Sequence, residues 1–310
     1  MKASIIAVLT VSAGLLFTSI ALPAEGDGGG AREGWNISAA LGGSASFTRY
    51  DNWQMGDVDN SSFNGIFDLS GTYLKGKNRW TNTFKAEYGV SKVEDQVSRK
   101  GSDQLALESI YRYQWRKHVR PFAQFTATAP AMPGYLHYDD PVTALFDRDR
   151  DAETGDRIRV SGGFEPLNLS EGVGLEFNVC NGEGDGRELN FRIGAAAKQL
   201  VADGYYIEND DEDTEEVEFT LVEKYEDVGA DAAVELKLPL HEHALLGSRL
   251  TGFYGFVEEF WKAEWETSLV FTLNKFLGVT ITGLMYYDEL VIDKAQWKTG
   301  TLLTLNYQLF

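Results

Sequence analysis

The chain has 310 residues, and its 47 acidic against 28 basic side chains give a formal net charge of −19 at pH 7. Phosphate backbones bind to basic surfaces, so this charge balance excludes nucleic acid as a partner. An anionic bilayer surface would also repel the chain unless divalent cations bridge the two.

The N-terminus has the pattern of a secretory signal. Lys2 precedes a largely apolar stretch over 5–20, and the small residues Ala21 and Ala24 both offer a cleavage site. We expect residues 1–24 to be a cleavable signal peptide, 25–34 a glycine-rich periplasmic leader, and 35–310 a single folded domain. No later stretch has the roughly 20 apolar residues of a spanning helix, so a membrane location would require a barrel.

Short segments of the remaining chain alternate apolar and polar residues. Leu236 and Leu238, for example, flank Lys237. A period of two predicts β-strands with one face toward an apolar medium and the other toward a polar one. We predict strands at 35–48, 63–75, 79–93, 103–116, 119–129, 157–165, 172–180, 188–199, 228–240, 247–257, 264–275, 278–290 and 297–310.

Short and long connections alternate along the chain. Short turns are expected at 76–78, 116–118 and 274–278, and long polar loops at 49–62, 94–102, 130–156 and 202–216. This alternation is typical of outer-membrane barrels, whose periplasmic turns are tight and whose extracellular loops are long. A soluble sandwich, with its polar faces merely solvated, is the alternative.

The thirteen predicted segments contain one error, because a barrel with both ends in the periplasm needs an even number of strands. Either 172–180 and 188–199 form one bent strand, which gives twelve, or 216–226 is an additional strand, which gives fourteen. We predict an all-β fold: an up-and-down antiparallel transmembrane β-barrel of twelve strands, in the outer membrane of a gram-negative bacterium.

The two faces of these strands differ in composition. The apolar faces carry aromatic residues near segment ends, as an interfacial girdle would: Trp80, Tyr113, Trp115, Trp265, Tyr287 and Trp297. The opposite faces carry charges of both signs, which would line the lumen: Asp68, Lys85, Glu87, Glu108, Arg112, Arg157, Arg159, Glu176, Arg192, Lys198, Glu235, Lys237 and Glu266. The acidic excess therefore belongs to the loops and the leader.

The chain ends on an aromatic residue, Phe310, which we interpret as a signal for the barrel insertion machinery. Leu305, Tyr307 and Leu309 form the apolar face of the last predicted strand, and Phe310 is one residue out of phase with them. The C-terminus therefore supports a barrel through its terminal aromatic residue, although its phase departs from the usual pattern.

Several short motifs resemble a known family. They are Asn52–Gly56, Lys75–Asn82 followed by Tyr88–Gly89, Asp103–Tyr111, Trp261–Glu266, Asn274–Phe276 and Met285–Glu289. Their order and spacing resemble a family of gram-negative outer-membrane proteins catalogued as a domain of unknown function, number three thousand and seventy-eight. The resemblance runs from about Trp35 to Asp288, with a departure over 166–226. It implies an outer-membrane barrel and brings no activity, substrate or catalytic residue.

Catalytic chemistry has little support in the sequence. A lipid hydrolase would need a nucleophile beside a histidine base, and only His137 falls in a long loop. His118, His241 and His243 fall in short turns. Ser109 and Ser161 are candidate nucleophiles that nothing in the sequence brings to His137. We therefore expect no enzymatic activity, with lipid hydrolysis as the remaining alternative.

Metal binding is expected to be loose at most, and no cofactor is expected. His241 and His243 share a face but lack further ligands at defined spacing, and Cys180 is expected to be inert. An acidic stretch around Asp147 lacks the glycine and the bidentate glutamate of a helix-loop-helix calcium site. Loose contacts with Ca²⁺ would come from Asp147, Asp149, Asp151, Asp210, Asp211 and Asp213.

Two functions remain open. The lumen could pass small solutes, with the acidic loops favouring cations, and a loop as long as 130–156 could fold inward to constrict it. Alternatively, salt bridges could close the lumen, and the barrel would present its loops to a partner or to lipopolysaccharide through divalent cations. We favour the channel. Outer-membrane lipid and lipopolysaccharide are the expected surroundings, while the sequence identifies neither a solute nor a partner protein.

Overall fold

The computed structural model describes residues 33–48, 60–93, 99–148, 150–181, 186–209, 214, 216–222, 224–274, 277–289 and 292–308. The predicted signal peptide, nearly all of the predicted leader and the terminal Phe310 lie outside these residues. Among the described residues, no helix is long and apolar enough to cross a membrane.

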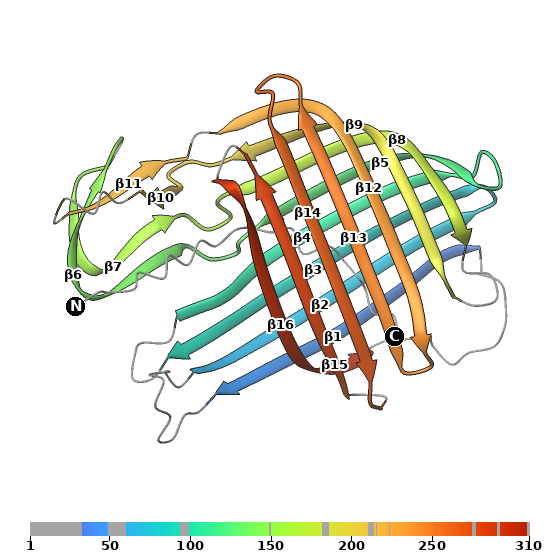
Figure 1. Ribbon diagram of the computed structural model, residues 1–310, viewed down its shortest axis with the longest axis horizontal. Helices are drawn as coiled ribbons and strands as arrows, with labels where there is room; N and C mark the ends of the chain where they lie inside the picture. The colour runs from blue at the N-terminus through green and yellow to red at the C-terminus, as the bar shows by residue number, and fades with distance from the viewer. Residues whose placement is uncertain are drawn as a thin grey trace.

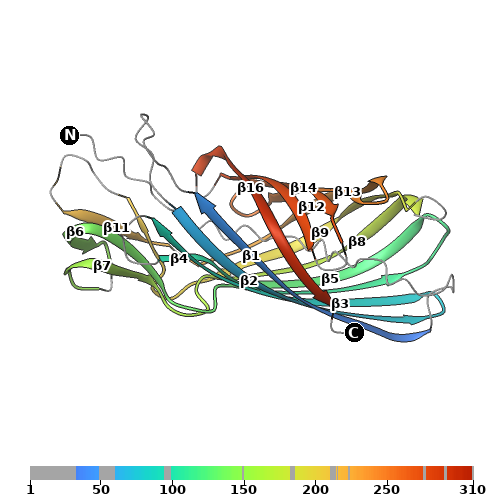
Figure 2. The same ribbon diagram turned by 90° about the horizontal axis from the view of Figure 1, so that it is seen from below.

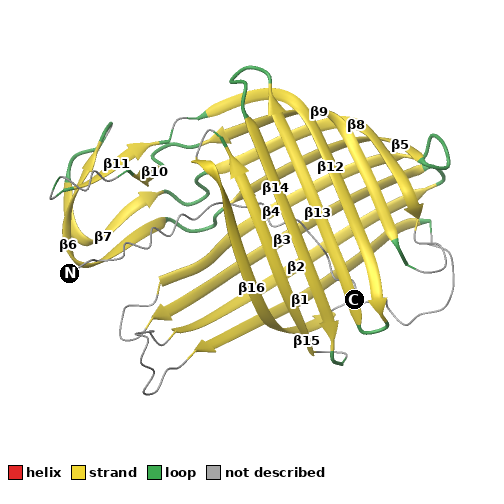
Figure 3. Cartoon of the chain, viewed as in Figure 1, coloured by secondary structure: helices red, strands yellow, loops and turns green. Residues whose placement is uncertain are grey.

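The described residues form sixteen strands (Figures 1 and 3). Twelve of these close into a barrel in the order β1-β2-β3-β4-β5-β8-β9-β12-β13-β14-β15-β16. They are β1 (Gly34–Thr48), β2 (Asn60–Lys75), β3 (Asn78–Val93), β4 (Arg99–Tyr113), β5 (Val119–Ala129), β8 (Leu167–Asn181), β9 (Glu188–Val201), β12 (Tyr225–His241), β13 (Ala244–Gly255), β14 (Trp261–Thr272), β15 (Leu277–Asp288) and β16 (Ile292–Gln308). The predicted twelve-stranded antiparallel barrel is confirmed.

The other four strands form a second sheet in the order β10-β11-β6-β7, which we call the loop sheet. They are β6 (Gly134–Phe146), β7 (Glu153–Ser161), β10 (Tyr206–Glu208) and β11 (Val217–Leu221). The first two belong to the connection from β5 to β8, and the last two to the connection from β9 to β12. The parallel pairing of β11 with β6 therefore joins two loops that are far apart in sequence.

The predicted strand list assigned one segment wrongly, and it missed β6 and β10, which fall in segments predicted as loops. Residues 157–165 do not belong to the barrel, because β7 pairs with β6 in the loop sheet. The segments 172–180 and 188–199 are two separate barrel strands, β8 and β9, rather than one bent strand. The segment 216–226 does contain a strand, β11, and that strand also lies in the loop sheet.

Pairing between the first and last strands closes the barrel. Residues 40–44 of β1 run antiparallel to residues 304–308 of β16, and β1 pairs with β2 along its whole length. In the described part of the chain, every barrel strand therefore has a hydrogen-bonded neighbour on both sides over at least part of its length. Since lipid offers no hydrogen-bond partner, this closure is what allows a sheet to span a membrane.

The two ends of the barrel differ in their connections. One end, which we call the short-turn end, holds the tight links between β2 and β3, β4 and β5, β12 and β13, and β14 and β15. The opposite, long-loop end gives rise to the loop sheet, which lies beyond the barrel wall (Figures 1 and 2). The loop predicted at 130–156 therefore folds outward into this sheet and does not enter the lumen.

The loop sheet has a small apolar core of its own. Ala144, Ile158, Tyr206 and Phe219 are buried together, and the rings of Phe146 and Phe219 stack with centroids 5.1 Å apart. Asp147 accepts a hydrogen bond of 2.9 Å from the Leu221 backbone N–H, which fixes the parallel pairing. These contacts make the loop sheet an ordered platform at the barrel mouth.

Glycines allow β8 and β9 to approach closely. Gly174 and Gly194 face each other across the two strands. A Cβ atom on Gly194 would lie 2.2 Å from the carbonyl oxygen of Val173, which belongs to the backbone and cannot rotate away. A side chain here would therefore push the two strands apart.

We predict that Gly194→Ala lowers the free energy of unfolding by about 1–3 kcal/mol, the usual cost of overpacking. Urea unfolding of the refolded protein in lipid vesicles, followed by tryptophan fluorescence, measures this loss. Gly252→Ala is the matched control, because a Cβ at Gly252 meets nothing within 4 Å. Equal unfolding midpoints for the two variants would contradict the close approach.

Candidate functional site

The inner surface of the barrel carries charged side chains at every second residue. Asp68 on β2 pairs in register with Lys85 on β3, and the same phase continues around the sheet. The predicted lumen-lining residues that fall on this inner phase are Asp68, Lys85, Glu87, Glu108, Arg112, Glu176, Arg192, Lys198, Glu235, Lys237 and Glu266. The alternate phase is apolar and exposed, as Ile37, Leu107 and Ile193 illustrate.

Two predicted lumen residues lie elsewhere. Arg157 and Arg159 are on β7, in the loop sheet, so assigning them to the barrel wall was wrong. The guanidinium of Arg157 stacks 3.7 Å from the centroid of the Tyr135 ring, and Arg159 donates a hydrogen bond to the Ser161 carbonyl. These two arginines alternate with Ile158 because one face of β7 packs on the core of the loop sheet. A strand with one buried face has the same period of two as a barrel strand.

The aromatic residues predicted for the girdle lie on the outer phase. Trp80, Tyr113, Trp115, Trp265 and Trp297 are all at least 38% exposed. Further aromatic residues of the outer surface were not predicted: Trp35, Tyr73 and Tyr111 near the short-turn end, and Tyr254 and Trp261 near the long-loop end. The predicted interfacial role of these side chains stays a prediction.

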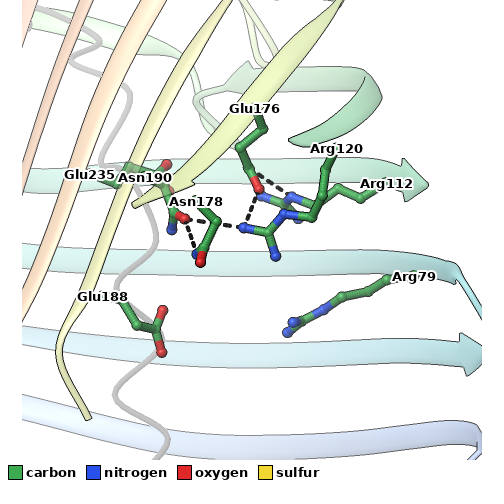
Figure 4. Close-up of a pocket in the computed structure, with 8 residues that line it drawn as sticks. All are labelled: Arg79, Arg112, Arg120, Glu176, Asn178, Glu188, Asn190 and Glu235. Atoms are coloured by element: carbon green, nitrogen blue, oxygen red, sulfur yellow. Dashed lines mark hydrogen bonds and ion pairs between the residues drawn. The ribbon is translucent and has the colours of Figure 1, made fainter. Parts of the chain in front are cut away.

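A network of arginines and glutamates occupies the inner wall near the short-turn end (Figure 4). Glu176 on β8 is 1% exposed and is shared by two guanidinium groups, at 2.9 Å from Arg112 and 2.6 Å from Arg120. Glu235 on β12 is shared likewise, at 2.7 Å from Arg192 and 3.3 Å from Arg249. Each of the two carboxylates thus lies between two guanidinium groups.

These groups border a cavity of about 230 Å³ inside the barrel. Its lining comes from β3, β4, β5, β8, β9 and β12 and consists of Arg79, Arg112, Arg120, Glu176, Asn178, Glu188, Asn190 and Glu235. Asn178 donates a hydrogen bond of 2.6 Å to Asn190, whose side-chain oxygen also accepts from Arg120 at 3.1 Å. The cavity wall is therefore almost entirely polar and held in place by hydrogen bonds.

A second charged group lies near the long-loop end. Lys198 is 3.6 Å from Asp231 and lies over the Phe253 ring, 4.2 Å from its centroid. Lys262 is 3.1 Å from Asp288, which also accepts a hydrogen bond from Tyr286. Of these residues, only Lys198 was predicted to line the lumen.

Aromatic packing and one carboxylate fix the loop between β13 and β14. Phe253 and Phe260 are almost fully buried and pack together on the inner side. Asp227 accepts hydrogen bonds from the backbone N–H groups of Phe256, Val257 and Glu258 at 3.0–3.1 Å. An apolar patch held by aromatic contacts and hydrogen bonds therefore lies on the inner wall at this end.

The structure does not assemble the candidate hydrolase. His137 lies on β6, and burial together with nearby Arg99 and Arg157 lowers its pKa. Ser161 accepts a hydrogen bond from the Gly134 backbone, and Ser109 donates one to Asn82. In the described part of the chain, neither hydroxyl bonds to His137.

Only some of the candidate metal ligands lie within the described residues. Among the described residues, no group of three or more His, Cys, Asp or Glu side chains is placed to hold a metal ion. Asp147 instead serves the loop sheet through its hydrogen bond to Leu221. Cys180 is a free, exposed cysteine on β8. Asp149, Asp210, Asp211 and Asp213 lie outside the described residues.

Three residues of the arginine network were missed: Arg79, Arg120 and Arg249. All three fall within predicted strands and on the polar phase, so the same alternation could have identified them. Their shared surroundings could not have been found in this way, because Glu176 meets Arg112 across two strand spacings. That neighbourhood exists only because β8 pairs with β5.

A closed barrel with an apolar outer surface and a charged interior is a β-barrel of the outer membrane. Residues 45–135 match the model of a family described as "Protein of unknown function (DUF3078)". This match confirms, over that segment, the resemblance found in the sequence motifs. No curated protein matches the chain.

Solved structures with a similar fold include two from gram-negative bacteria. The translocator domain of autotransporter NalP from Neisseria meningitidis has a TM-score of 0.43 and 10% identity, covering 91% of this chain and 90% of that one. The COG4313 outer membrane channel from Pseudomonas putida F1 has a TM-score of 0.42 and 11% identity, covering 91% and 97%. At this identity, neither assigns a solute or a partner to the present chain.

We predict that Glu176→Gln destabilises the barrel by about 3 kcal/mol, because removing one partner of a buried ion pair leaves the other charge uncompensated. Glu242→Gln, in the exposed turn between β12 and β13, is the control and should change the free energy by less than about 0.5 kcal/mol. Urea unfolding in vesicles compares them, and equal stability of both variants would argue against a structural role for Glu176.

Proposed function

We propose that the protein is a passive channel for small solutes across the outer membrane. The observation that carries this proposal is the direction of the inner ion pairs. Arg112 with Glu176, Lys198 with Asp231, and Lys262 with Asp288 each join strands at most two places apart in the barrel. Ion pairs between nearby strands of the same wall do not bridge the lumen, and this favours a lumen that is filled with water.

The size and lining of the barrel support the same function. Twelve strands fall between the small barrels filled by side chains and the wide porins. Among the described residues, the connections from β5 to β8 and from β9 to β12 form the loop sheet beyond the barrel wall rather than entering the lumen. A modest pore, with Phe253 and Phe260 on its inner wall at one end, fits small solutes.

A preference for cations is part of this proposal. The inner wall carries acidic and basic side chains in similar numbers, whereas the whole chain has a net charge of −19. The excess of acid therefore falls in sequence segments between the barrel strands, such as the segment that precedes β11. Acidic groups at a pore mouth raise the local concentration of cations.

The refolded protein is expected to produce steady single-channel steps in a planar bilayer. Under a gradient of potassium chloride, the reversal potential should have the sign of a cation-selective pore, and raising the salt should weaken the preference because ions screen the loops. An unboiled sample that migrates differently on a gel from a boiled one verifies that the protein is folded and able to insert. Silence from such protein would contradict the channel.

The loop sheet favours a second candidate function. Its four ordered strands and apolar core give the barrel a platform outside the wall. A barrel that acts by docking would present this platform and the neighbouring acidic loops to a partner protein, or to lipopolysaccharide bridged by divalent cations. Folded protein that is silent in the bilayer experiment would favour this function over the channel.

A further inference from the structure

The cavity near the short-turn end contains guanidinium donors that are not fully satisfied. Three arginines and three glutamates line it, and two of the glutamates, Glu176 and Glu235, are each shared by two guanidinium groups. Of the arginines that line the cavity, Arg120 has a buried Nε without a hydrogen-bond partner among the described residues. Buried donors without acceptors are costly, which makes an added anion favourable here.

Arg79 adds a guanidinium that is free to bind a ligand. Its side chain extends from β3 into the cavity, on the side opposite Glu188 (Figure 4). Within the described part of the chain, it makes neither a hydrogen bond nor an ion pair. Glu188 and Glu176 attract it from a distance, whereas Arg112 and Arg120 repel it, and an anion placed between the three guanidinium groups would relieve that repulsion.

We propose that this cavity is a binding site for the carboxylate group of a small organic anion. A guanidinium presents a planar fork of N–H donors that matches the two oxygens of a carboxylate. A volume of about 230 Å³ accommodates an organic acid of a few carbons with some water, since one water takes roughly 30 Å³ in the liquid.

One residue keeps the binding weak. Glu188 lines the cavity opposite Arg79 and repels an entering carboxylate. A solute that passes through a lumen must be able to leave its site, so binding in the millimolar range suits transport. The proposal specifies the class of ligand that binds in the lumen. Only the role of this binding in transport rests on the proposed channel function.

The test measures binding of succinate to the refolded protein in detergent micelles by saturation-transfer NMR. Succinate should bind saturably, and uncharged succinamide should not. Arg79→Gln is expected to weaken binding about tenfold, the effect of one hydrogen bond to a charged group. Because Arg79 has no ion pair to lose, this variant keeps the Glu176 and Glu235 networks intact.

Two further variants control the experiment. Glu188→Gln removes the repelling carboxylate and should strengthen succinate binding several-fold. Arg116→Gln removes the same charge from the exposed turn between β4 and β5, where Arg116 lies over Trp115, and should leave binding unchanged. An absence of saturable binding, equal binding of succinamide, or equal affinities of Arg79→Gln and the parent protein would overturn the proposal.

The result can be separated from the fate of the channel. Binding in micelles does not require conduction, so binding by a protein that is silent in bilayers would uphold the site and contradict only the channel. Conductance steps without succinate binding would contradict only the site. In a conducting protein with the site, Arg79→Gln should also move the reversal potential toward greater cation selectivity.

Discussion

The whole structure depends on closing the backbone hydrogen bonds of the sheet. Lipid supplies no donor or acceptor, and each unpaired backbone group in it costs several kcal/mol. The pairing of residues 40–44 with 304–308 joins the two edges that an open sheet of these strands would expose. Once the sheet is closed, every barrel side chain points either to lipid or to the lumen, and the alternating sequence follows from that choice.

The same constraint explains the polar groups on the outer surface. The indole N–H of Trp80 donates a hydrogen bond to Ser109 at 2.9 Å, and that of Trp265 donates one to Ser248 at 3.0 Å. A serine on the neighbouring strand therefore satisfies each indole without water. On the inner surface, where water is available, charges of both signs are tolerated and form pairs along the wall.

The alternation of apolar and polar residues was enough to predict the barrel strands, because lipid and lumen impose opposite polarities on successive residues. It failed at 157–165, since Ile158 packs into the loop-sheet core while Arg157 and Arg159 flank it. A sheet with its own core produces the same period as a membrane wall. The partners of Glu176 were beyond prediction for another reason. The chain between β5 and β8 forms part of the loop sheet instead of a barrel strand, so β5 and β8 become neighbours in the barrel.

The most direct test of this account is the accessibility of adjacent residues on one strand. In a Cys180→Ser background, single cysteines at Phe84, Lys85, Ala86 and Glu87 on β3 would be treated with a membrane-impermeant thiol reagent in lipid vesicles. The account predicts that Lys85→Cys and Glu87→Cys react, whereas Phe84→Cys and Ala86→Cys are protected by lipid. Reaction at all four positions would contradict a membrane-spanning wall, and protection at all four would contradict a hydrated lumen.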